Sequence, residues 1–249
     1  MGVSGKRWAV HDREGNPIYL TEERWDHITD PSNHPEVGDF EDLVMVALRR
    51  GRRRQEPLNP RKYRYALLSA SLPPGFTHVV VIVVFGVDVD TLGRSTPNNY
   101  VATVFFQAHR IQELIMMPKY TLSSSADTAI HYDYDQDVDI LYVSFVSGVP
   151  ATTAVELNEN ILLRFNLERR QAVGLTLMDF SVLAQPTPLG PRHFPLSGLQ
   201  DLELDRQEIV LDLLAAAPVN HILTIAAYAA SASEMLPIVS IENPFAVVA

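Results

Sequence analysis

The 249 residues have an ordinary globular composition, with 47% hydrophobic and 20% charged residues, and they include no cysteine. This length predicts one large domain or two of ordinary size, and the lack of thiols excludes disulfides, thiolate nucleophiles and cysteine-ligated metals. The apolar run at 78–87 is too short to span a membrane, and the first fifteen residues lack the apolar core of a secretory signal. We therefore expect a cytoplasmic protein without a membrane partner.

The net charge of −10 is unevenly distributed. Residues 1–118 contain 14 Lys/Arg and 14 Asp/Glu, whereas residues 119–249 contain 6 and 16. Within the first half, the segment 49–64 holds eight basic residues and a single acid, Glu56. Such a cluster suits a phosphate backbone, and a solvated basic loop explains it equally well.

The first predicted elements are a hairpin over 8–19 and two helices. Thr21 is the expected N-cap of the first helix, because two glutamates follow in its first turn, where the helix dipole favours acids. This helix must end before Pro31. An apolar stripe at helical spacing predicts the second helix, from Asp39 to the residue before Gly51.

Strands dominate the next part of the chain, and helices return near its end. Alternating and β-branched patterns predict three strands and, after a helical or irregular link at 111–125, five more. These strands are expected at 62–72, 78–89, 100–107, 131–134, 138–145, 151–157, 161–166 and 172–180. A proline-rich linker then precedes an amphipathic helix at 198–217, an alanine-rich helix at 220–235 and a short strand at 237–242.

This order predicts an α+β protein. We expect two N-terminal helices on an antiparallel sheet, then a small antiparallel β domain, then a C-terminal helical extension. The corresponding domain boundaries are 1–117, 118–185 and 186–249.

The first half contains a short motif. The residues TEERWDHI at 21–28, followed by HPE at 34–36, resemble the phage-associated nucleases of the barnase–EndoU–colicin–RelE (BECR) superfamily, over about residues 8–110. The resemblance implies two small helices packed on a curved antiparallel sheet. It also implies metal-independent RNA cleavage at the open face of that sheet, with Thr103 contacting the scissile phosphate.

A second motif begins in the acidic half. The residues YDYDQDVDILYV at 132–143, ELNENI at 156–161 and VGL at 173–175, with Asp179, are similar to the family known as domain of unknown function 2283. The similarity covers about residues 129–181. Members of that family are usually short, free-standing proteins, and some look like the antitoxin half of a toxin–antitoxin pair. The resemblances imply a toxin-like domain followed by an antitoxin-like domain.

RNA cleavage of this type requires no cofactor, because the 2′-hydroxyl is the nucleophile. A base and an acid transfer protons, and cations stabilise the charge on the phosphate. His27 and His34 are the leading pair for proton transfer. Packing or loop capping explains each histidine equally well. Glu36 either acts as the base or only orients His34, and no other glutamate stands out as a base.

Cationic and polar side chains on the predicted strands are the candidates for phosphate binding. Lys62 and Arg64 share one face of their strand, and such a pair can clamp a phosphate. Thr103 shares a face with Phe105. A charged solvent face and an ordinary strand threonine are the alternatives. We assign His27, His34, Arg64 and Thr103 to catalysis, and Lys62, Arg61, Tyr63, Tyr65 and Arg53 to substrate binding.

The alternating aspartates at 133–139 begin like a calcium-binding loop but do not continue as one. The required glycine is replaced by Val138 and the required bidentate acid by Ser144. A hairpin turn at 135–137, solubilised by carboxylates, is the stronger interpretation. No metal site is predicted.

Two hypotheses follow. In the first, the protein is a ribonuclease that binds RNA and is regulated by its own acidic domain. In the second, it is a non-catalytic interaction or structural protein that keeps a nuclease-like shape, and its apolar C-terminal helices form a homo-oligomer contact. Convergence of the four catalytic candidates on one cleft would favour the first.

Overall fold

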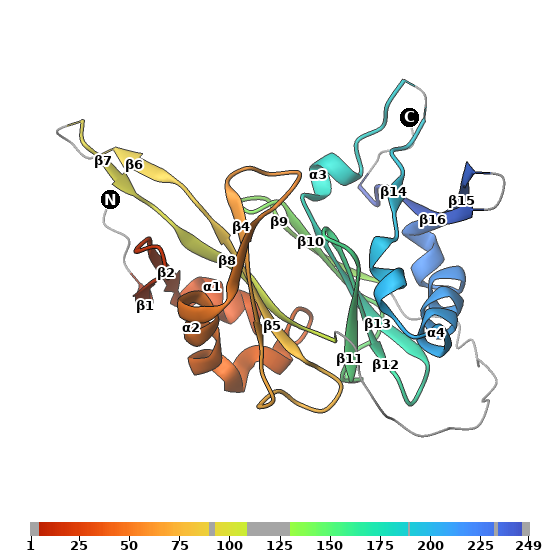
Figure 1. Ribbon diagram of the computed structural model, residues 1–249, viewed down its shortest axis with the longest axis horizontal. Helices are drawn as coiled ribbons and strands as arrows, with labels where there is room; N and C mark the ends of the chain where they lie inside the picture. Colours follow the sequence, from red (N-terminus) through yellow and green to blue (C-terminus); the bar gives the residue numbers. More distant parts are fainter. Residues whose placement is uncertain (1–4, 90–92, 109–129, 189, 232–233, 246–249) are drawn as a thin grey trace. The chain divides into compact units, whose positions relative to one another are not determined.

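The computed structural model describes residues 5–89, 93–108, 130–188, 190–231 and 234–245. The predicted link at 111–125 lies outside these residues. The chain divides into two compact units, unit 1 (Met1–Ala108) and unit 2 (His109–Ala249), which are described separately below. Figure 1 shows the elements of each unit in chain order.

Unit 1 is built around one six-stranded sheet in the order β1-β2-β8-β5-β4-β3. The pairing is antiparallel except between β2 and β8, which meet in parallel at Tyr19 and Tyr100. A separate two-stranded ribbon, β6–β7, extends the β5–β8 connection. The strands are β1 (Lys6–His11), β2 (Pro17–Thr21), β3 (Arg52–Gln55), β4 (Lys62–Leu68), β5 (His78–Val84), β6 (Val87–Val89), β7 (Ser95–Pro97) and β8 (Tyr100–Gln107).

The helices of unit 1 lie between β2 and β3 in the chain. They are α1 (Glu22–Ile28), the 3₁₀-helix η1 (Pro35–Phe40) and α2 (Glu41–Arg50). Thr21 caps α1 as predicted, because its Oγ1 accepts a hydrogen bond from the Arg24 N–H at 3.1 Å. The apolar stripe of α2, which includes the buried Val44, Ala47 and Leu48, packs against β5, β4 and β1.

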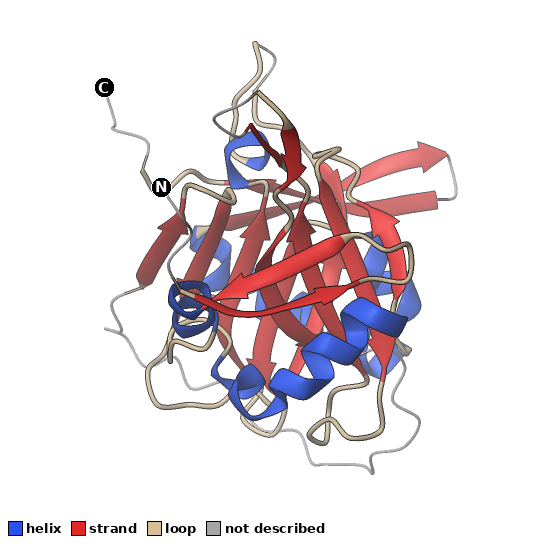
Figure 2. Ribbon diagram, turned by 90° about the vertical axis from the view of Figure 1, so that its left-hand side faces the viewer, coloured by secondary structure: helices blue, strands red, loops and turns tan. Residues whose placement is uncertain are grey.

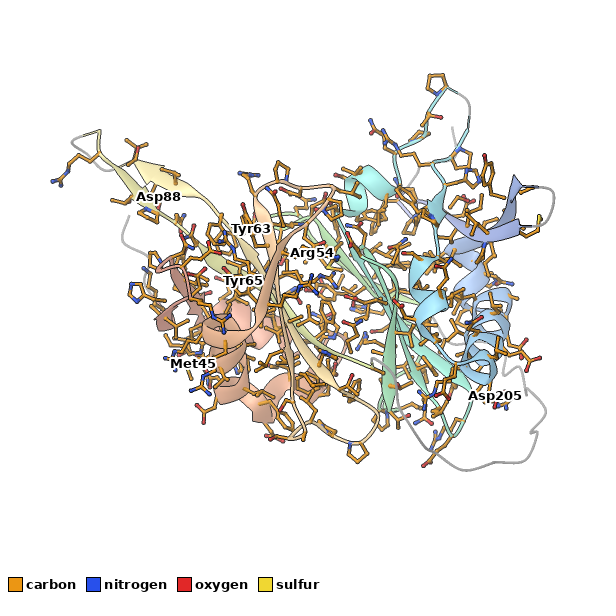
Figure 3. All side chains as sticks on the ribbon, viewed as in Figure 1. Met45, Arg54, Tyr63, Tyr65, Asp88 and Asp205 are labelled. Carbon is orange, nitrogen blue, oxygen red and sulfur yellow. The ribbon has the colours of Figure 1, made fainter. Side chains whose placement is uncertain are left out.

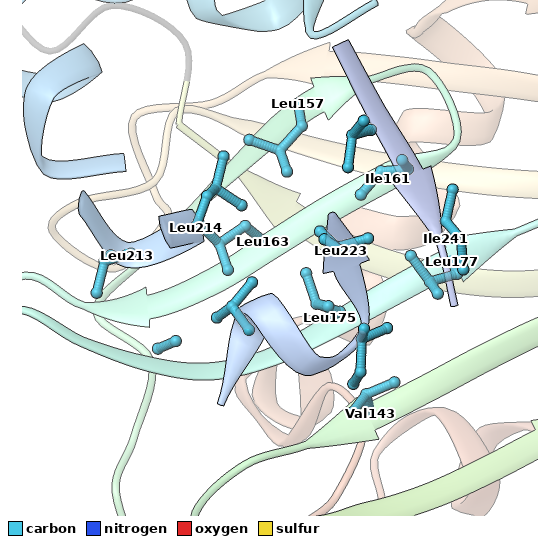
Figure 4. Packing of buried hydrophobic residues seen from close by; sticks show 14 of the residues in the cluster. Val143, Leu157, Ile161, Leu163, Leu175, Leu177, Leu213, Leu214, Leu223 and Ile241 are labelled. Carbon is cyan, nitrogen blue, oxygen red and sulfur yellow. The ribbon is translucent and has the colours of Figure 1, made fainter. Parts of the chain in front are cut away.

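Unit 2 contains a five-stranded antiparallel sheet in the order β11-β12-β13-β10-β9 and a three-stranded sheet in the order β14-β16-β15. A single apolar cluster joins one face of the larger sheet to α4 and to the smaller sheet, and Figure 4 shows its leucines interdigitating. The strands are β9 (His131–Asp135), β10 (Ile140–Ser144), β11 (Thr153–Asn158), β12 (Ile161–Asn166), β13 (Gln171–Met178), β14 (Phe194–Pro195), β15 (Leu223–Ser231) and β16 (Glu234–Ile241).

The helices of unit 2 are short apart from one. They are α3 (Phe180–Leu183), η2 (Ser197–Asp201), α4 (Leu204–Ala215) and η3 (Val219–His221). The residues that α4 buries, Val210, Leu213 and Leu214, belong to the same apolar cluster as the larger sheet. Among the described residues, no helix has both the length and the apolarity needed to cross a bilayer.

The predicted fold class is wrong. The described residues form sixteen strands and only four α-helices, so the protein is mostly β rather than two helices on a sheet followed by a β domain and a helical extension. Figure 2 shows this predominance of strands. The predicted helix at 220–235 is instead the strand β15 and the start of β16, which pair with each other from Leu223 onward. The predicted homo-oligomer contact used the two expected C-terminal helices, and the second of these is a strand.

The error at 220–235 has a physical reason. Alanine has the highest intrinsic helix propensity, and this segment is rich in it. Its large side chains nevertheless follow a period of two, because Leu223 is buried, Thr224 exposed and Ile225 half-buried. Pairing with β16, a sequence neighbour that carries Ile238, Val239 and Ile241, outweighs the local preference.

Candidate functional site

One row of side chains crosses the sheet of unit 1. Arg54 of β3 pairs with Arg64 of β4, Arg64 pairs with Ile82 of β5, and Ile82 pairs with Thr103 of β8. Residues directly opposite one another in a sheet project from the same face. Arg64 and Thr103 are therefore two strands apart on one face, about 10 Å between their Cα atoms.

Phe105 is the centre of this face. It lies two residues beyond Thr103 on β8 and so projects from the same side. The ring of His34 lies 5.8 Å from the Phe105 ring, centroid to centroid, and the Arg64 guanidinium lies 6.0 Å from that centroid. His34 comes from the loop between α1 and η1, so three separate segments of unit 1 meet here. We call this group, with Glu36 and Glu56, the Phe105 site.

Each basic side chain of the Phe105 site has a carboxylate beside it. The Nδ1 atom of His34 is 3.2 Å from Oε1 of Glu36, two residues later in the chain. The Nε of Arg64 donates to Oε1 of Glu56 at 2.8 Å. A carboxylate on one imidazole nitrogen fixes the orientation of the ring, as in catalytic histidine pairs. Glu36 is thus placed to orient His34, which was one of its two predicted alternatives, and its role stays a prediction.

Thr103 contributes an unusual group to this face. The residue is fully buried, and its hydroxyl has no hydrogen-bond partner among the described residues. A buried donor without a partner costs about 1–3 kcal/mol of stability, and a methyl group in place of the hydroxyl would not carry this cost. A ligand oxygen or a water at this position would give the hydroxyl a partner.

We expect Thr103→Val to stabilise unit 1 by about 1 kcal/mol, because it replaces the unpartnered hydroxyl with a methyl group of similar size. The measurement is urea denaturation followed by tryptophan fluorescence, since both tryptophans, Trp8 and Trp25, belong to unit 1. Thr103→Ser, which keeps the hydroxyl, is the matched control and should not stabilise. A Thr103→Val protein that is clearly less stable would mean that the hydroxyl has a partner.

The remaining substrate-binding candidates divide between the two faces of β4. Lys62 is buried on the face of Arg64, and Arg61 precedes it as an exposed residue of the β3–β4 connection. Tyr63 and Tyr65 project from the opposite face, as the pairing of Tyr65 with Arg53 and of Arg64 with Arg54 requires. Figure 3 labels Arg54, Tyr63 and Tyr65 on these two faces.

Arg53, Tyr63 and Tyr65 have structural partners on their own face. The Arg53 guanidinium lies 4.0 Å from the Tyr63 ring centroid and forms an ion pair with Glu14. The Tyr65 hydroxyl donates to the Asp12 carboxylate at 2.7 Å. Burial and this hydrogen bond raise the pKa of Tyr65. These contacts hold the β1–β2 turn against β3 and β4, so the three residues lie away from the Phe105 site.

His27 occupies the C-terminal part of α1 and is half-buried. Its carbonyl accepts a hydrogen bond from the Asn33 side chain at 2.8 Å, and the His34 N–H donates to the Ile28 carbonyl at 2.9 Å. These bonds tie the end of α1 to the loop that carries His34. Of the two histidines, His34 is the one with a recorded ring contact to Phe105.

Two residues of the Phe105 site were not predicted as site residues. Glu56 had one signal in the sequence, as the single acid among eight basic residues, and it is 4% exposed beside Arg64. Phe105 had none, because an aromatic residue in a strand is most often part of a core. Its role emerges only from the residues that gather around it.

The alternating aspartates of unit 2 form the predicted hairpin between β9 and β10. Asp139 accepts hydrogen bonds from the Tyr134 hydroxyl at 2.8 Å and the Ser181 hydroxyl at 2.7 Å, and so connects the hairpin to α3. In the described part of the chain, no group of three or more metal-ligating side chains is found.

Comparison with family models gives a match in unit 2. Residues 131–181 match the family model described as "Protein of unknown function (DUF2283)", which confirms the similarity predicted for about 129–181. The matched segment runs from the start of β9 to the start of α3. No curated protein and no solved structure matches the chain.

Proposed function

We propose that unit 1 is an endoribonuclease whose reaction takes place at the Phe105 site. The observation that supports the proposal is that His34 and Arg64 both lie beside Phe105, which shares a sheet face with Thr103. A histidine beside a carboxylate, a guanidinium and a hydroxyl are among the groups that phosphodiester cleavage by an internal nucleophile uses. The resemblance of residues 8–110 to nucleases, on which the choice of these residues partly rests, motivates the proposal.

In the proposed step, the 2′-oxygen attacks the adjacent phosphorus while the bond from phosphorus to the 5′-oxygen breaks. The products are a 2′,3′-cyclic phosphate and a 5′-hydroxyl end. One general base receives the proton of the 2′-hydroxyl, and one general acid gives a proton to the departing 5′-oxygen. His34 transfers one of these protons, and Arg64 and Thr103 donate hydrogen bonds to the phosphate oxygens, where charge develops.

Regulation by the acidic half is the second part of the proposal. The segment 119–249 carries the whole net charge of −10, whereas the basic cluster at 49–64 belongs to unit 1. Opposite charges steer two surfaces toward each other, and the attraction between them weakens as the salt concentration increases. We propose that unit 2 acts as an inhibitor of unit 1 on the same chain. The similarity of residues 129–181 to antitoxin-like proteins is in keeping with this role.

The test separates the two units of the full chain. A site for a specific protease is inserted between residues 108 and 130, and after cleavage a terminal affinity tag on unit 1 is used to wash away unit 2 in about 0.5 M salt, which screens exposed charges. We expect the unit 1 fraction to cleave RNA in the presence of EDTA, the intact chain to be much less active, and added unit 2 to restore inhibition.

The outcomes of this test are distinct. A folded unit 1, identified by its native tryptophan emission, that leaves RNA intact would overturn the ribonuclease proposal. An intact chain as active as free unit 1 would overturn only the regulation.

A specific observation favours the alternative, a non-catalytic interaction protein. In the folded chain, His34 and Thr103 are 0% exposed and Arg64 is 5% exposed, and the charge of Arg64 is already matched by Glu56. A buried ion pair of this kind can serve structure alone. The alternative predicts that unit 1 remains inert when isolated and that Glu56→Gln reduces its stability without creating activity.

A further inference from the structure

The strand β15 is an open edge of unit 2. In the order β14-β16-β15 it pairs with β16 on one side and with no described strand on the other. Its nine residues, LTIAAYAAS, include no charge and no proline. Proteins usually protect an exposed edge of this length with lysine, proline or a covering element, because unpaired backbone groups bind further strands.

Pro237 of β16 shows which residues of β15 direct their backbone N–H and C=O groups to the open side. This residue pairs with Ala227, has no N–H, and its carbonyl accepts from the Leu196 N–H at 3.0 Å, on the side of β14. Pro237 and Ala227 are therefore a non-hydrogen-bonded pair of the antiparallel ladder. Ala227 directs its own N–H and C=O away from β16, and alternation gives Ile225 and Ala229 the same direction.

The outer part of β15 is accessible. Ala226, Ala227 and Ala229 are exposed, and Tyr228 is 59% exposed. Nearer its start the strand is anchored, because Leu223 belongs to the buried cluster of unit 2 and Ile225 packs against that cluster. No hydrogen bond from the outward groups of Ala227 and Ala229 to another described residue is recorded. A firmly anchored strand thus presents unpaired backbone to solvent.

We propose that β15 pairs antiparallel with β15 of a second copy of this chain, around a two-fold axis at Ala227. In this register the outward N–H and C=O of Ala227 bond to Ala227 of the second copy. Those of Ile225 bond to Ala229 of the second copy. The side chains also fit, since Tyr228 faces Ala226 and Ile225 faces Ala229, one large residue against one small residue each time.

The lack of charge on β15 permits a second copy as the occupant of this edge. The chain carries a net charge of −10, which opposes self-association over most surfaces. The uncharged β15 is a place where two copies meet without repulsion between side chains of the strand. RNA is a poor occupant, because the strand offers no cation to a phosphate.

The first experiment measures the mass of the full chain in solution. Sedimentation at tens of micromolar should give twice the 27.8 kDa of one chain. Ala227→Pro removes an outward N–H but none that pairs with β16, so it should give a monomer. Ala227→Ser keeps the N–H and should remain a dimer. Ala229→Lys, at an exposed position, protects the edge with charge and should also give a monomer even if the proline variant does not fold.

The second experiment tests the register, and the absence of native cysteine keeps it free of background. Ala227→Cys places two sulfur-bearing residues opposite each other, with Cα atoms about 5.5 Å apart, so oxidation should give a covalent dimer. Thr224→Cys places the same groups about 20 Å apart and should not cross-link. A monomeric wild-type chain, a dimeric Ala229→Lys variant, or equal cross-linking at both positions would overturn the proposal.

Discussion

Replacement of His34 by glutamine is expected to slow RNA cleavage by separated unit 1 by a factor of about 10²–10⁴, the usual contribution of a group that transfers a proton in the reaction. His34 is the group of the Phe105 site suited to this role near neutral pH. Glutamine keeps a polar side chain beside Glu36 but does not transfer a proton. The rate constant is measured on a short labelled RNA under single-turnover conditions.

The pH profile distinguishes proton transfer from a structural effect. One limb of the wild-type profile should disappear in His34→Gln, whereas a structural change would lower the rate at every pH without altering the shape. His11→Gln is the matched control, because His11 is an exposed histidine at the end of β1 in the same unit. If both variants cleave at the wild-type rate, His34 does not transfer a proton.

Gly198→Ala is expected to destabilise unit 2 by about 3 kcal/mol, at the upper end for a side chain forced into a packed interior. A Cβ atom on Gly198 would overlap the Glu156 carbonyl oxygen and lie 2.9 Å from the carbonyl carbon. Both are backbone atoms of β11, so no side-chain rotation removes the clash. The helix η2 would have to move away from the strand on which it packs.

Urea denaturation followed by far-UV circular dichroism measures the loss, because unit 2 has no tryptophan. The tryptophan fluorescence of the same samples reports unit 1 and serves as an internal reference. Gly38→Ala is the matched control, since its Cβ atom would have no neighbour closer than 3.9 Å. A shift of the Gly198→Ala dichroism curve no larger than that of Gly38→Ala would show that η2 is not held against β11.

Several elements were predictable because their causes are local. Thr21 caps α1 through a bond to a residue three positions later, and Gly51 follows α2 directly. The strand at 78–84 is buried along nearly its whole length, as a run of β-branched residues predicts. The acidic hairpin around Asp135 forms within the segment that matches the DUF2283 family model.

The candidate site was predictable only in part. Period-two alternation correctly separated Lys62 and Arg64 from Tyr63 and Tyr65, because alternation is a local property of an extended backbone. It did not indicate that Tyr65 is bound to Asp12, nor that Glu56 accompanies Arg64. Those partners depend on which strands become neighbours.

The sequence alone therefore determined the N-cap of α1, the end of α2 at Gly51, strand faces, the division of charge and the similarity of residues 131–181 to a family. Tertiary structure alone decided that His34 and Arg64 both lie beside the Phe105 ring, and that an alanine-rich segment becomes the edge strand β15. The physical reason is the same in both cases. Pairing between strands and burial of side chains from distant segments supply more free energy than the conformational preference of any single segment, and a local pattern does not contain those contacts.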